Sequence, residues 1–178
     1  PCTSATSARL YKKRLMEHAR KTGFPEEVNL GFSCHDFSMR GMAGLDAAII
    51  SGMAHMTSFC GSETIPAIEA VEHYYNANVT EELVAATVPA SEHSVMCAGG
   101  EDGEIETYRR LINDLYPTGI ISIVSDTWDF WQVVEKFLPK LKADIMRRVG
   151  RVVIRPDSGD PVDIICGLRT NPHYHTAM

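Results

Sequence analysis

Short apolar runs alternate with longer amphipathic segments along the chain. The apolar runs predict strands at residues 30–34, 56–60, 84–88, 119–124 and 151–154. Apolar residues at helical spacing predict helices at residues 8–21, 41–55, 63–75, 91–115, 128–138 and 161–168. The glycine pair Gly99 and Gly100 is a candidate break within residues 91–115. The strand at residues 119–124 is the strongest, because its sequence GIISIV is apolar, β-branched and continuous.

A strand followed by a helix therefore recurs five times. This alternation predicts a parallel sheet covered by helices, either an open doubly wound sheet or a barrel. A complete eightfold barrel needs roughly 250 residues, so five such units in 178 residues predict a partial barrel. The chain also begins with Pro1 rather than Met, and its last predicted helix is short. We therefore expect a single fragment, residues 1–178, of a larger α/β barrel domain with parts missing at both ends.

Composition and charge narrow the classes of protein further. Hydrophobic residues make up 44% of the chain and charged residues 22%, which suits a globular core. The net charge of −6 disfavours a general nucleic-acid binder, which usually carries the opposite sign. The five cysteines are odd in number and include no CxxC pair, so we expect a reducing cytoplasm and not a disulfide framework or a zinc ribbon. No apolar run is long enough for a membrane span, and no signal peptide is recognised.

Polar clusters follow all of the predicted strands. They are residues 35–40 (HDFSMR), 62–64 (SET), 92–94 (EHS), 125–126 (SD) and 155–160 (RPDSGD). In a parallel sheet the carboxyl ends of the strands share one edge, where such folds bind ligands. Arg40 and Arg155 lie in these clusters, beside helix N-termini that already carry partial positive charge. The two arginines predict an anionic ligand such as phosphate or pyrophosphate, which guanidinium groups bind bidentately.

The same clusters also have a purely structural interpretation. The residues that suit helix N-caps or first turns are Ser62, Glu63, Asp126, Asp129, Asp157 and Ser158. Arg155 and Asp157 could form a structural ion pair instead of a phosphate site. The residues by themselves leave both interpretations open.

Histidines and tryptophans add weaker signals. A lone histidine is more often packed or at the surface than catalytic, but His93 is a candidate because it shares the predicted edge with the arginines. His173 and His175 lie two residues apart without a third ligand, which is a weak pattern for a metal site, so we predict none. Trp128 and Trp131 are spaced for core packing rather than for a stacking platform.

Five motifs resemble those of the nicotinamide phosphoribosyltransferase family in order and approximate spacing. They are HDFSMRG at residues 35–41, GSET at 61–64, VPASEHS at 88–94, VSD at 124–126 and IRPDSG at 154–159. The resemblance extends over nearly the whole chain, to about residue 163, and the combination of HDFxxRG, PAxEHS and RPDSG is specific. It implies an irregular α/β barrel of the type II phosphoribosyltransferases, which acts in the cytoplasm as a homodimer with active sites at the interface.

The resemblance also implies which residues bind substrate. Nicotinamide and phosphoribosyl pyrophosphate would be converted to nicotinamide mononucleotide and pyrophosphate. Phe37 would stack on the nicotinamide ring, and Glu63 would hydrogen-bond the carboxamide in place of the usual aspartate. Ser122 would line the nicotinamide tunnel, and Arg40 would hold phosphate or pyrophosphate.

The catalytic residues implied by the resemblance are His93, Arg155 and Asp157. His93 would be phosphorylated when ATP hydrolysis is coupled to synthesis, so ATP is an expected co-substrate. Arg155 and Asp157 would contact the ribose, the base and the phosphates. Mg²⁺ bound to the pyrophosphate would assist its departure, while the arginines and His93 would stabilise the developing negative charge.

Three other functions stay open at the level of sequence. A nicotinate phosphoribosyltransferase has the same fold, although Glu63 should repel nicotinate and favour the neutral amide. A sugar-phosphate isomerase or aldolase barrel would need a lysine or a carboxylate at a strand end, whereas the lysines here fall on predicted helices or loops. The chain could also be an inactive, truncated barrel that serves only in binding.

Overall fold

A computed structural model describes residues 1–23 and 30–168. The chain forms two compact units, Pro1–Thr87 and Val88–Met178. Each unit contains its own two-stranded parallel sheet. The histidine pair His173 and His175 lies outside the described residues. Among the described helices, none is both long and apolar enough to cross a lipid bilayer.

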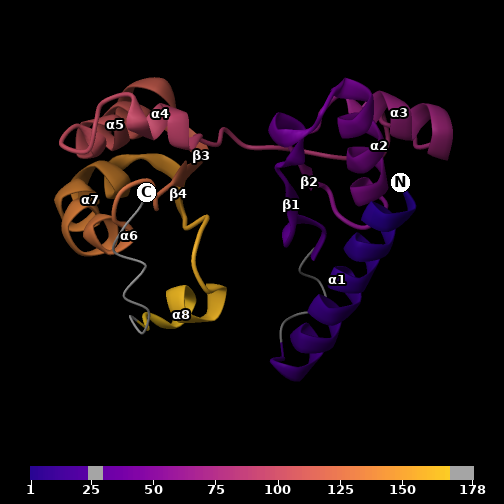
Figure 1. Cartoon of the computed structure of the whole chain (residues 1–178), viewed down its shortest axis with the longest axis horizontal. Helices are drawn as coiled ribbons and strands as arrows, with labels where there is room; N and C mark the ends of the chain where they lie inside the picture. Colours follow the sequence, from indigo (N-terminus) through magenta and orange to yellow (C-terminus); the bar gives the residue numbers. More distant parts are fainter. Residues whose placement is uncertain (24–29, 169–178) are drawn as a thin grey trace. The chain divides into compact units, whose positions relative to one another are not determined.

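The α-helices described in the first unit are α1 (Cys2–Lys21), α2 (Leu45–Met56) and α3 (Ala67–Tyr75). α2 packs against both α1 and α3 (Figure 1). The contact with α3 is close because Gly52 has no side chain. A Cβ at Gly52 would lie 3.0 Å from Ala67 Cβ in α3 and 2.8 Å from Thr64 Cγ2 in the loop before it, nearer than side chains normally approach. The absence of a side chain at Gly52 therefore permits the close packing of α2 against α3.

The sheet of the first unit is short. β1 (His35–Asp36) pairs in parallel with β2 (Gly61–Ser62), so that Asp36 lies opposite Ser62. A single parallel bridge adds Ala86 beside β2. The loops that follow β1 and β2 leave the same edge of this sheet, and they carry two of the predicted polar clusters.

The second unit is built around a longer parallel pair, β3 (Thr118–Val124) and β4 (Val149–Arg155). The strands are in register along their whole length, and Val124 lies opposite Arg155 at the carboxyl edge. A parallel bridge also joins Ala90 to Ser122 of β3. This pairing brings residues that are far apart in the sequence to one edge of the second unit.

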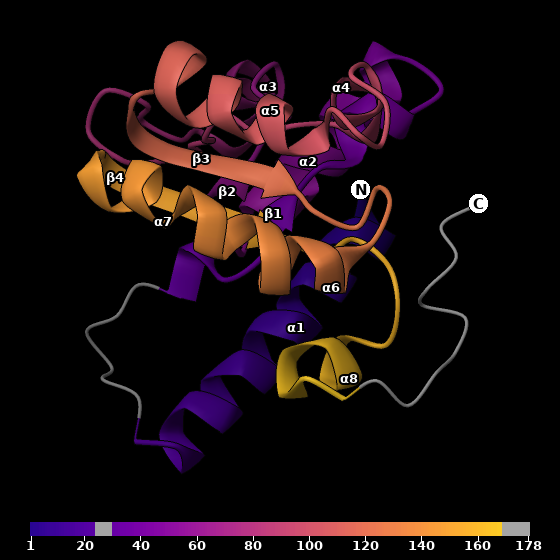
Figure 2. The ribbon, with the colours of Figure 1, turned by 90° about the vertical axis from the view of Figure 1, so that its left-hand side faces the viewer.

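Helices cover this strand pair (Figure 2). Along the chain they are α4 (His93–Cys97), α5 (Glu104–Arg109), the π-helical stretch η3 (Arg110–Leu115), α6 (Phe130–Gln132), the π-helical stretch η4 (Val133–Phe137), α7 (Leu138–Arg147) and α8 (Pro161–Cys166). The buried core of the unit consists of Met96, Tyr108, Leu111, Ile112, Ile121, Ile123, Val124, Val133 and Leu141. The carboxyl half of β3 is buried while its amino half is exposed, so packing is tightest next to the edge that carries the polar clusters.

Two of the predicted strands are confirmed, because residues 119–124 lie within β3 and residues 151–154 within β4. The other three were wrong in position. Residues 30–32 form a 3₁₀ turn, residues 57–60 join α2 to β2, and of residues 84–88 only Ala86 forms a bridge. Phe59 explains the second error: it is only 1% exposed, yet its backbone N–H donates to His55 O as an extension of α2. Its apolar character reflects burial and not strand pairing.

The predicted helices are confirmed in location, but several of their ends were wrong. The first helix begins at Cys2, six residues before residue 8. The helix expected from residue 41 begins at Leu45, because residues 38–41 form a 3₁₀ turn (η2). The helix expected from residue 63 begins at Ala67, directly after Pro66. Residues 91–115 are divided between α4 and α5, with the predicted break at Gly99 and Gly100 confirmed.

The helix predicted to end at Leu138 continues to Arg147. The predicted end directly precedes Pro139, and proline usually ends a helix. In the structure the helix widens into the π-helical stretch η4 just before that proline. Pro139 then occupies the first turn of α7, where its missing N–H costs little.

The described strands pair in parallel and alternate with helices, which confirms an α/β fold with parallel strands. In the described residues the sheets are two separate pairs, and neither closes into a barrel. The predicted barrel of five βα units is therefore not confirmed.

Candidate active site

Arg155 ends β4 in the second unit, and its guanidinium group is held by neighbouring backbone and side-chain oxygens. Nη2 donates to the Ser91 carbonyl at 2.7 Å, and Nη1 donates to Ser122 Oγ at 3.2 Å. Ser91 is fixed in turn by β3, because its N–H donates to the Ser122 carbonyl at 2.8 Å. Only 15% of the Arg155 side chain is exposed. The strand register thus places an oriented, permanent cation at the carboxyl edge of the sheet.

Asp126 follows β3 and joins three segments of the second unit. Its Oδ1 lies 3.2 Å from His93 Nε2, at the start of α4. Its Oδ2 accepts hydrogen bonds from the Asp157 N–H, at 3.0 Å, and from the Ser158 hydroxyl. Only 6% of the Asp126 side chain is exposed, against 43% for His93. We call these four residues the Asp126 cluster, in which a buried carboxylate orients an accessible imidazole.

Helix capping accounts for few of these polar residues. Asp126, Asp157, Ser158 and Ser62 were all suitable N-caps, but none caps a helix in the structure. Asp129 caps α6, accepting from Trp131 and Gln132 N–H groups, and Asp160 caps α8, accepting from Val162 and Asp163 N–H groups. The alternative Arg155–Asp157 ion pair is long, at 3.9 Å between Nε and Oδ1. The main partners of Arg155 are therefore Ser91 and Ser122.

The polar cluster of the first unit centres on an ion pair. Arg40 donates to Glu63 through two nitrogens, with 3.0 Å between Nε and Oε1. The guanidinium group also lies over the Phe37 ring, 5.9 Å from its centroid. The side chains are 38% exposed for Arg40 and 16% exposed for Glu63. The loops after β1 and β2 thus bring together Phe37, Arg40 and Glu63, the three substrate-binding residues predicted in this unit.

Asp36 holds these two loops to each other. Its Oδ1 accepts from the Ser38 N–H at 2.9 Å, and its Oδ2 accepts from Thr64 Oγ1 at 2.9 Å and Ser62 Oγ at 3.3 Å. Partial burial opposes ionisation of this carboxyl, but the hydrogen bonds from Ser38 and Thr64, with His55 nearby, outweigh it and lower the pKa of Asp36. An ionised Asp36 therefore fixes the backbone on both sides of the Arg40–Glu63 pair.

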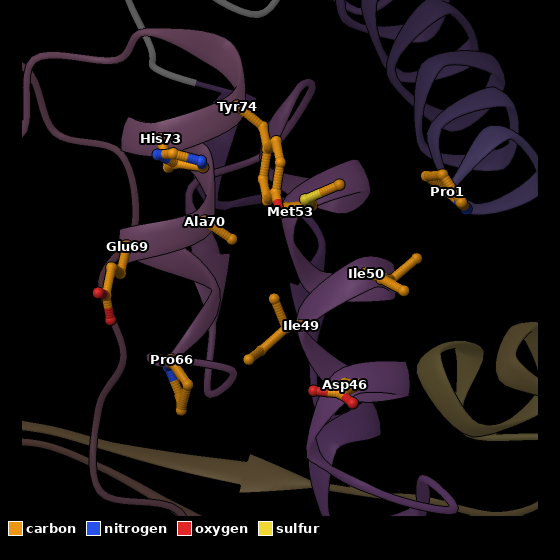
Figure 3. A pocket seen from close by; sticks show the side chains of 10 residues that line it. All are labelled: Pro1, Asp46, Ile49, Ile50, Met53, Pro66, Glu69, Ala70, His73 and Tyr74. Atoms are coloured by element: carbon orange, nitrogen blue, oxygen red, sulfur yellow. The ribbon is translucent and has the colours of Figure 1, made fainter.

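Cavities lie beside some of these residues. Phe37 and Asp36 line a cavity of about 380 Å³ that also touches Tyr11 of α1. Asp157 lines another of about 250 Å³ next to α8. A groove of about 670 Å³ lies between α2 and α3, and its lining includes Met53 of α2 and Tyr74 of α3 (Figure 3). None of the predicted site residues lines this groove. The volume of a cavity therefore does not indicate where the active site of this chain lies.

A family model described as the nicotinate phosphoribosyltransferase (NAPRTase) family matches residues 32–178. The chain belongs to this family. The matched range contains all five motifs found in the sequence, and with them the Asp126 cluster, Arg155 and the Arg40–Glu63 pair. The polar residues at the strand ends are therefore those of a phosphoribosyltransferase-family chain.

Several curated relatives of the chain carry the name nicotinamide phosphoribosyltransferase. One from Acinetobacter baylyi is 53% identical over 171 residues, covering 93% of this chain and 33% of the relative. One from Mycoplasma pneumoniae is 38% identical over 175 residues, covering 98% of this chain and 35% of the relative. One from Xanthomonas campestris pv. campestris is 33% identical over 167 residues, covering 93% of this chain and 35% of the relative. The chain thus spans about a third of the length of the relatives it matches, and the resemblance to this family is confirmed.

The predicted site residues of this family member fall into two groups, one in each unit. Phe37, Arg40 and Glu63 gather in the first unit, whereas the second brings together Ser122, His93, Arg155 and Asp157. That Arg40, His93 and Arg155 grip one shared ligand stays a prediction.

Sequence reasoning missed several residues that hold these groups in place. Asp36 and Ser91 lie inside the HDF and PASEHS motifs, so the motifs contained a signal for both. Asp126 had no assigned role before its contacts with His93 and Ser158 were seen. Tyr108 carried no local signal, because its partner Ser125 lies 17 residues away. Within residues 1–23 and 30–168 there is no group of three His, Cys, Asp or Glu side chains that could hold a metal ion.

Proposed function

We propose that this chain is part of a nicotinamide phosphoribosyltransferase, which joins nicotinamide to the ribose of phosphoribosyl pyrophosphate and releases pyrophosphate. The observation that carries the proposal is the second unit's edge, where Arg155 stands beside the Asp126 cluster at the carboxyl ends of β3 and β4. A fixed guanidinium and an accessible imidazole together suit an anion that leaves during the reaction. The shared name of the curated relatives supports the same activity.

The reaction forms a bond from the ring nitrogen to the ribose carbon as the bond to pyrophosphate breaks. Negative charge grows on the leaving oxygens, and Arg155 is oriented in advance by Ser91 and Ser122 to meet it. Pre-orientation matters because no reorganisation is then needed in the transition state. Mg²⁺ would arrive with phosphoribosyl pyrophosphate and neutralise part of its charge. Asp157 would contact the ribose from the loop that Asp126 anchors.

The first unit would bind the base. Phe37 offers a ring for stacking, and Glu63 offers a carboxylate that can accept from the carboxamide NH₂. The structure adds that Glu63 is paired with Arg40, so the base would meet both charges. Glu63 favours the neutral amide, whereas Arg40 gives nicotinate a possible cationic partner. Nicotinate is therefore the second candidate substrate, and the name shared by the relatives favours the amide.

Substrate choice is directly measurable in the protein expressed with any coding sequence that flanks these residues. We expect kcat/KM to be at least about tenfold higher for nicotinamide than for nicotinate, because Glu63 repels the nicotinate carboxylate. Nucleotide formation from each base and phosphoribosyl pyrophosphate would be followed by chromatography. Glu63→Gln should narrow the preference, while Glu69→Gln, an exposed carboxylate on α3, should leave it intact. A preference for nicotinate would overturn the assignment, and no product from either base would overturn the activity.

His93 is the proposed site of phosphorylation by ATP. Its ring is 43% exposed and is oriented through Nε2 by Asp126, so the imidazole is both reachable and fixed. We expect His93→Ala to abolish the stimulation of synthesis by ATP while leaving ATP-independent synthesis measurable. The readout is nucleotide formed per minute with and without ATP. Replacement of His73, an exposed histidine on α3, provides the control. Unchanged ATP stimulation in His93→Ala would exclude this role.

We also propose the larger architecture that the family resemblance implies. The two parallel strand pairs would be sections of an irregular α/β barrel, and the active form would be a cytoplasmic homodimer with the site at its interface. The parallel order of the strands within each unit supports the barrel. The mass of the active protein in solution tests the dimer.

A further inference from the structure

Helix α5 presents two buried polar side chains to the interior of the second unit. They are Glu104 and Tyr108, and both are 0% exposed. Their spacing of four residues places them on the same face of the helix, one turn apart. Neither belongs to the motifs of the sequence or to the groups already assigned to substrate binding. Buried polar side chains normally have hydrogen-bond partners, and those partners indicate which segments they hold in place.

Tyr108 holds the start of the loop that carries Asp126. Its hydroxyl donates to Ser125 Oγ at 2.7 Å, and Ser125 Oγ donates onward to the Ile123 carbonyl at 2.8 Å. The Ser125 N–H donates to the Arg155 carbonyl at 2.9 Å. Ser125 is completely buried. One tyrosine hydroxyl is therefore linked, through a single serine, to the backbone of both β3 and β4 directly before Asp126.

Glu104 lies one turn earlier on α5 and is also completely buried. Among the described residues, neither carboxylate oxygen of Glu104 has a hydrogen-bond partner, and the buried Thr127 Oγ1 and Trp128 Nε1 also have none. Burial, with the nearby carboxylates of Glu101 and Asp129, raises the pKa of Glu104 to about 7. Asp129, whose charge contributes to the raised pKa, caps α6 directly after Thr127 and Trp128. Glu104, Thr127 and Trp128 thus each carry a buried polar group that needs a partner, and buried water can supply one.

We propose that Glu104 and Tyr108 are positioning residues for the His93–Asp126 pair. Tyr108 fixes the loop at Ser125, and Glu104 fixes it through buried water bound to Thr127 and Trp128. Asp126 lies between these two anchors, so α5 sets the direction from which its carboxylate meets His93 Nε2. The catalytic importance of the pair rests on the proposed function, but the positioning itself does not.

The test records the ¹⁵N signals of the His93 ring in the 178-residue chain, without substrates and at a pH where imidazole is neutral. These signals report which ring nitrogen carries the proton and whether Nε2 is hydrogen-bonded. The His93 signals are assigned by their loss in His93→Asn. We expect Glu104→Leu to lower the population of the Nε2–H form severalfold, while Glu104→Gln, which still binds water, keeps it. Glu106→Gln, an exposed carboxylate on the same helix, is the matched control.

Two outcomes would overturn the proposal. One is a Glu104→Leu chain that is folded by circular dichroism and has the same His93 signals as Glu106→Gln. The other is a Tyr108→Phe chain with unchanged signals, since that variant keeps the buried ring and removes only the hydroxyl. If Glu104→Leu does not fold, the other two variants still test the proposal. It then requires that Tyr108→Phe loses the Nε2–H form and that Glu104→Gln keeps it.

An activity measurement separates this proposal from the proposed function. In the active protein, Glu104→Leu should lower ATP-stimulated kcat about tenfold with little change in KM for nicotinamide, because orientation and not binding is lost. Glu104→Gln should keep most of the ATP-stimulated kcat. An equal loss of kcat in Glu104→Leu and Glu104→Gln would contradict the positioning role. If no nucleotide forms at all, the proposed function is wrong. The ¹⁵N signals of the His93 ring still test the positioning proposal independently.

Discussion

Replacing Arg155 with alanine should lower kcat/KM for nucleotide formation by about 10²–10³-fold, the usual cost of removing one oriented donor from a developing negative charge. The side chain is mostly buried, and both of its terminal nitrogens are already committed to Ser91 and Ser122. At this strand end the Ser91 carbonyl and Ser122 Oγ accept hydrogen bonds from the guanidinium group of Arg155. Initial rates with saturating and limiting phosphoribosyl pyrophosphate measure the loss.

Two further variants separate charge from geometry. Arg155→Lys keeps the charge but cannot bond Ser91 and Ser122 together, so it should recover only a small part of the activity. Arg151→Ala removes an exposed arginine from the same strand and should be close to the parent protein. If Arg155→Ala kept more than about a third of the activity with an unchanged fold, the proposed anion site at this edge would have to be abandoned.

Glu104→Gln should stabilise the protein above neutral pH, and the gain should disappear in acid. The pKa of Glu104 is raised from 4.5 to about 7 by burial and by the neighbouring carboxylates of Glu101 and Asp129. In the unfolded chain the group ionises near its ordinary value, whereas in the folded chain it stays neutral until about pH 7. The contribution of Glu104 to the free energy of unfolding is therefore fully present below about pH 4.5 and is lost as the pH rises through about 7. The lost free energy of unfolding is about 3 kcal/mol, taking about 1.4 kcal/mol per pH unit.

Urea denaturation at several pH values between 4 and 8 would measure this difference. The glutamine variant should show a flatter dependence of unfolding free energy on pH than the parent chain, and the two should converge near pH 4.5. Glu106→Gln changes the same charge at an exposed position on α5 and should follow the parent at every pH. Parallel curves for the parent and Glu104→Gln would show that the buried carboxyl is not the titrating group.

The ion pair between Arg40 and Glu63 changes how the base site is understood. The sequence assigned Arg40 to phosphate and Glu63 to the carboxamide, as if the two acted separately. In the structure they share two hydrogen bonds beside the Phe37 ring. A substrate that used either group would therefore disturb the other, because each ion of the pair screens its partner. We therefore expect the Arg40–Glu63 ion pair as a whole to determine whether the site prefers nicotinamide or nicotinate.

The sequence was most informative where an element is decided by its own residues. The strand at residues 119–124 was predicted correctly because a short, continuous run of apolar and β-branched residues is typical of a buried strand. The break between α4 and α5 was found because glycine disfavours a helix wherever it lies. The polar clusters that contain the predicted site residues were located because the strand-to-helix loops of a parallel sheet leave one edge.

Elements decided by contacts between distant residues were missed or misplaced. β1 and β2 are only two residues long, and they are strands because they pair with each other, which no local pattern of apolar residues records. The helical segment also continues from the π-helical stretch η4 past Pro139 to Arg147, which the spacing of apolar residues did not predict.

By itself, then, the sequence determined the family, the parallel α/β character and the identity of the polar residues at the strand ends. The tertiary structure alone decided how those residues are held: Asp126 between His93 and Ser158, Arg155 against Ser91 and Ser122, and Glu63 against Arg40. The reason is that a hydrogen bond depends on the direction and distance of two groups within a few ångströms. Those quantities are set by strand register and helix packing across gaps of 23 to 64 residues.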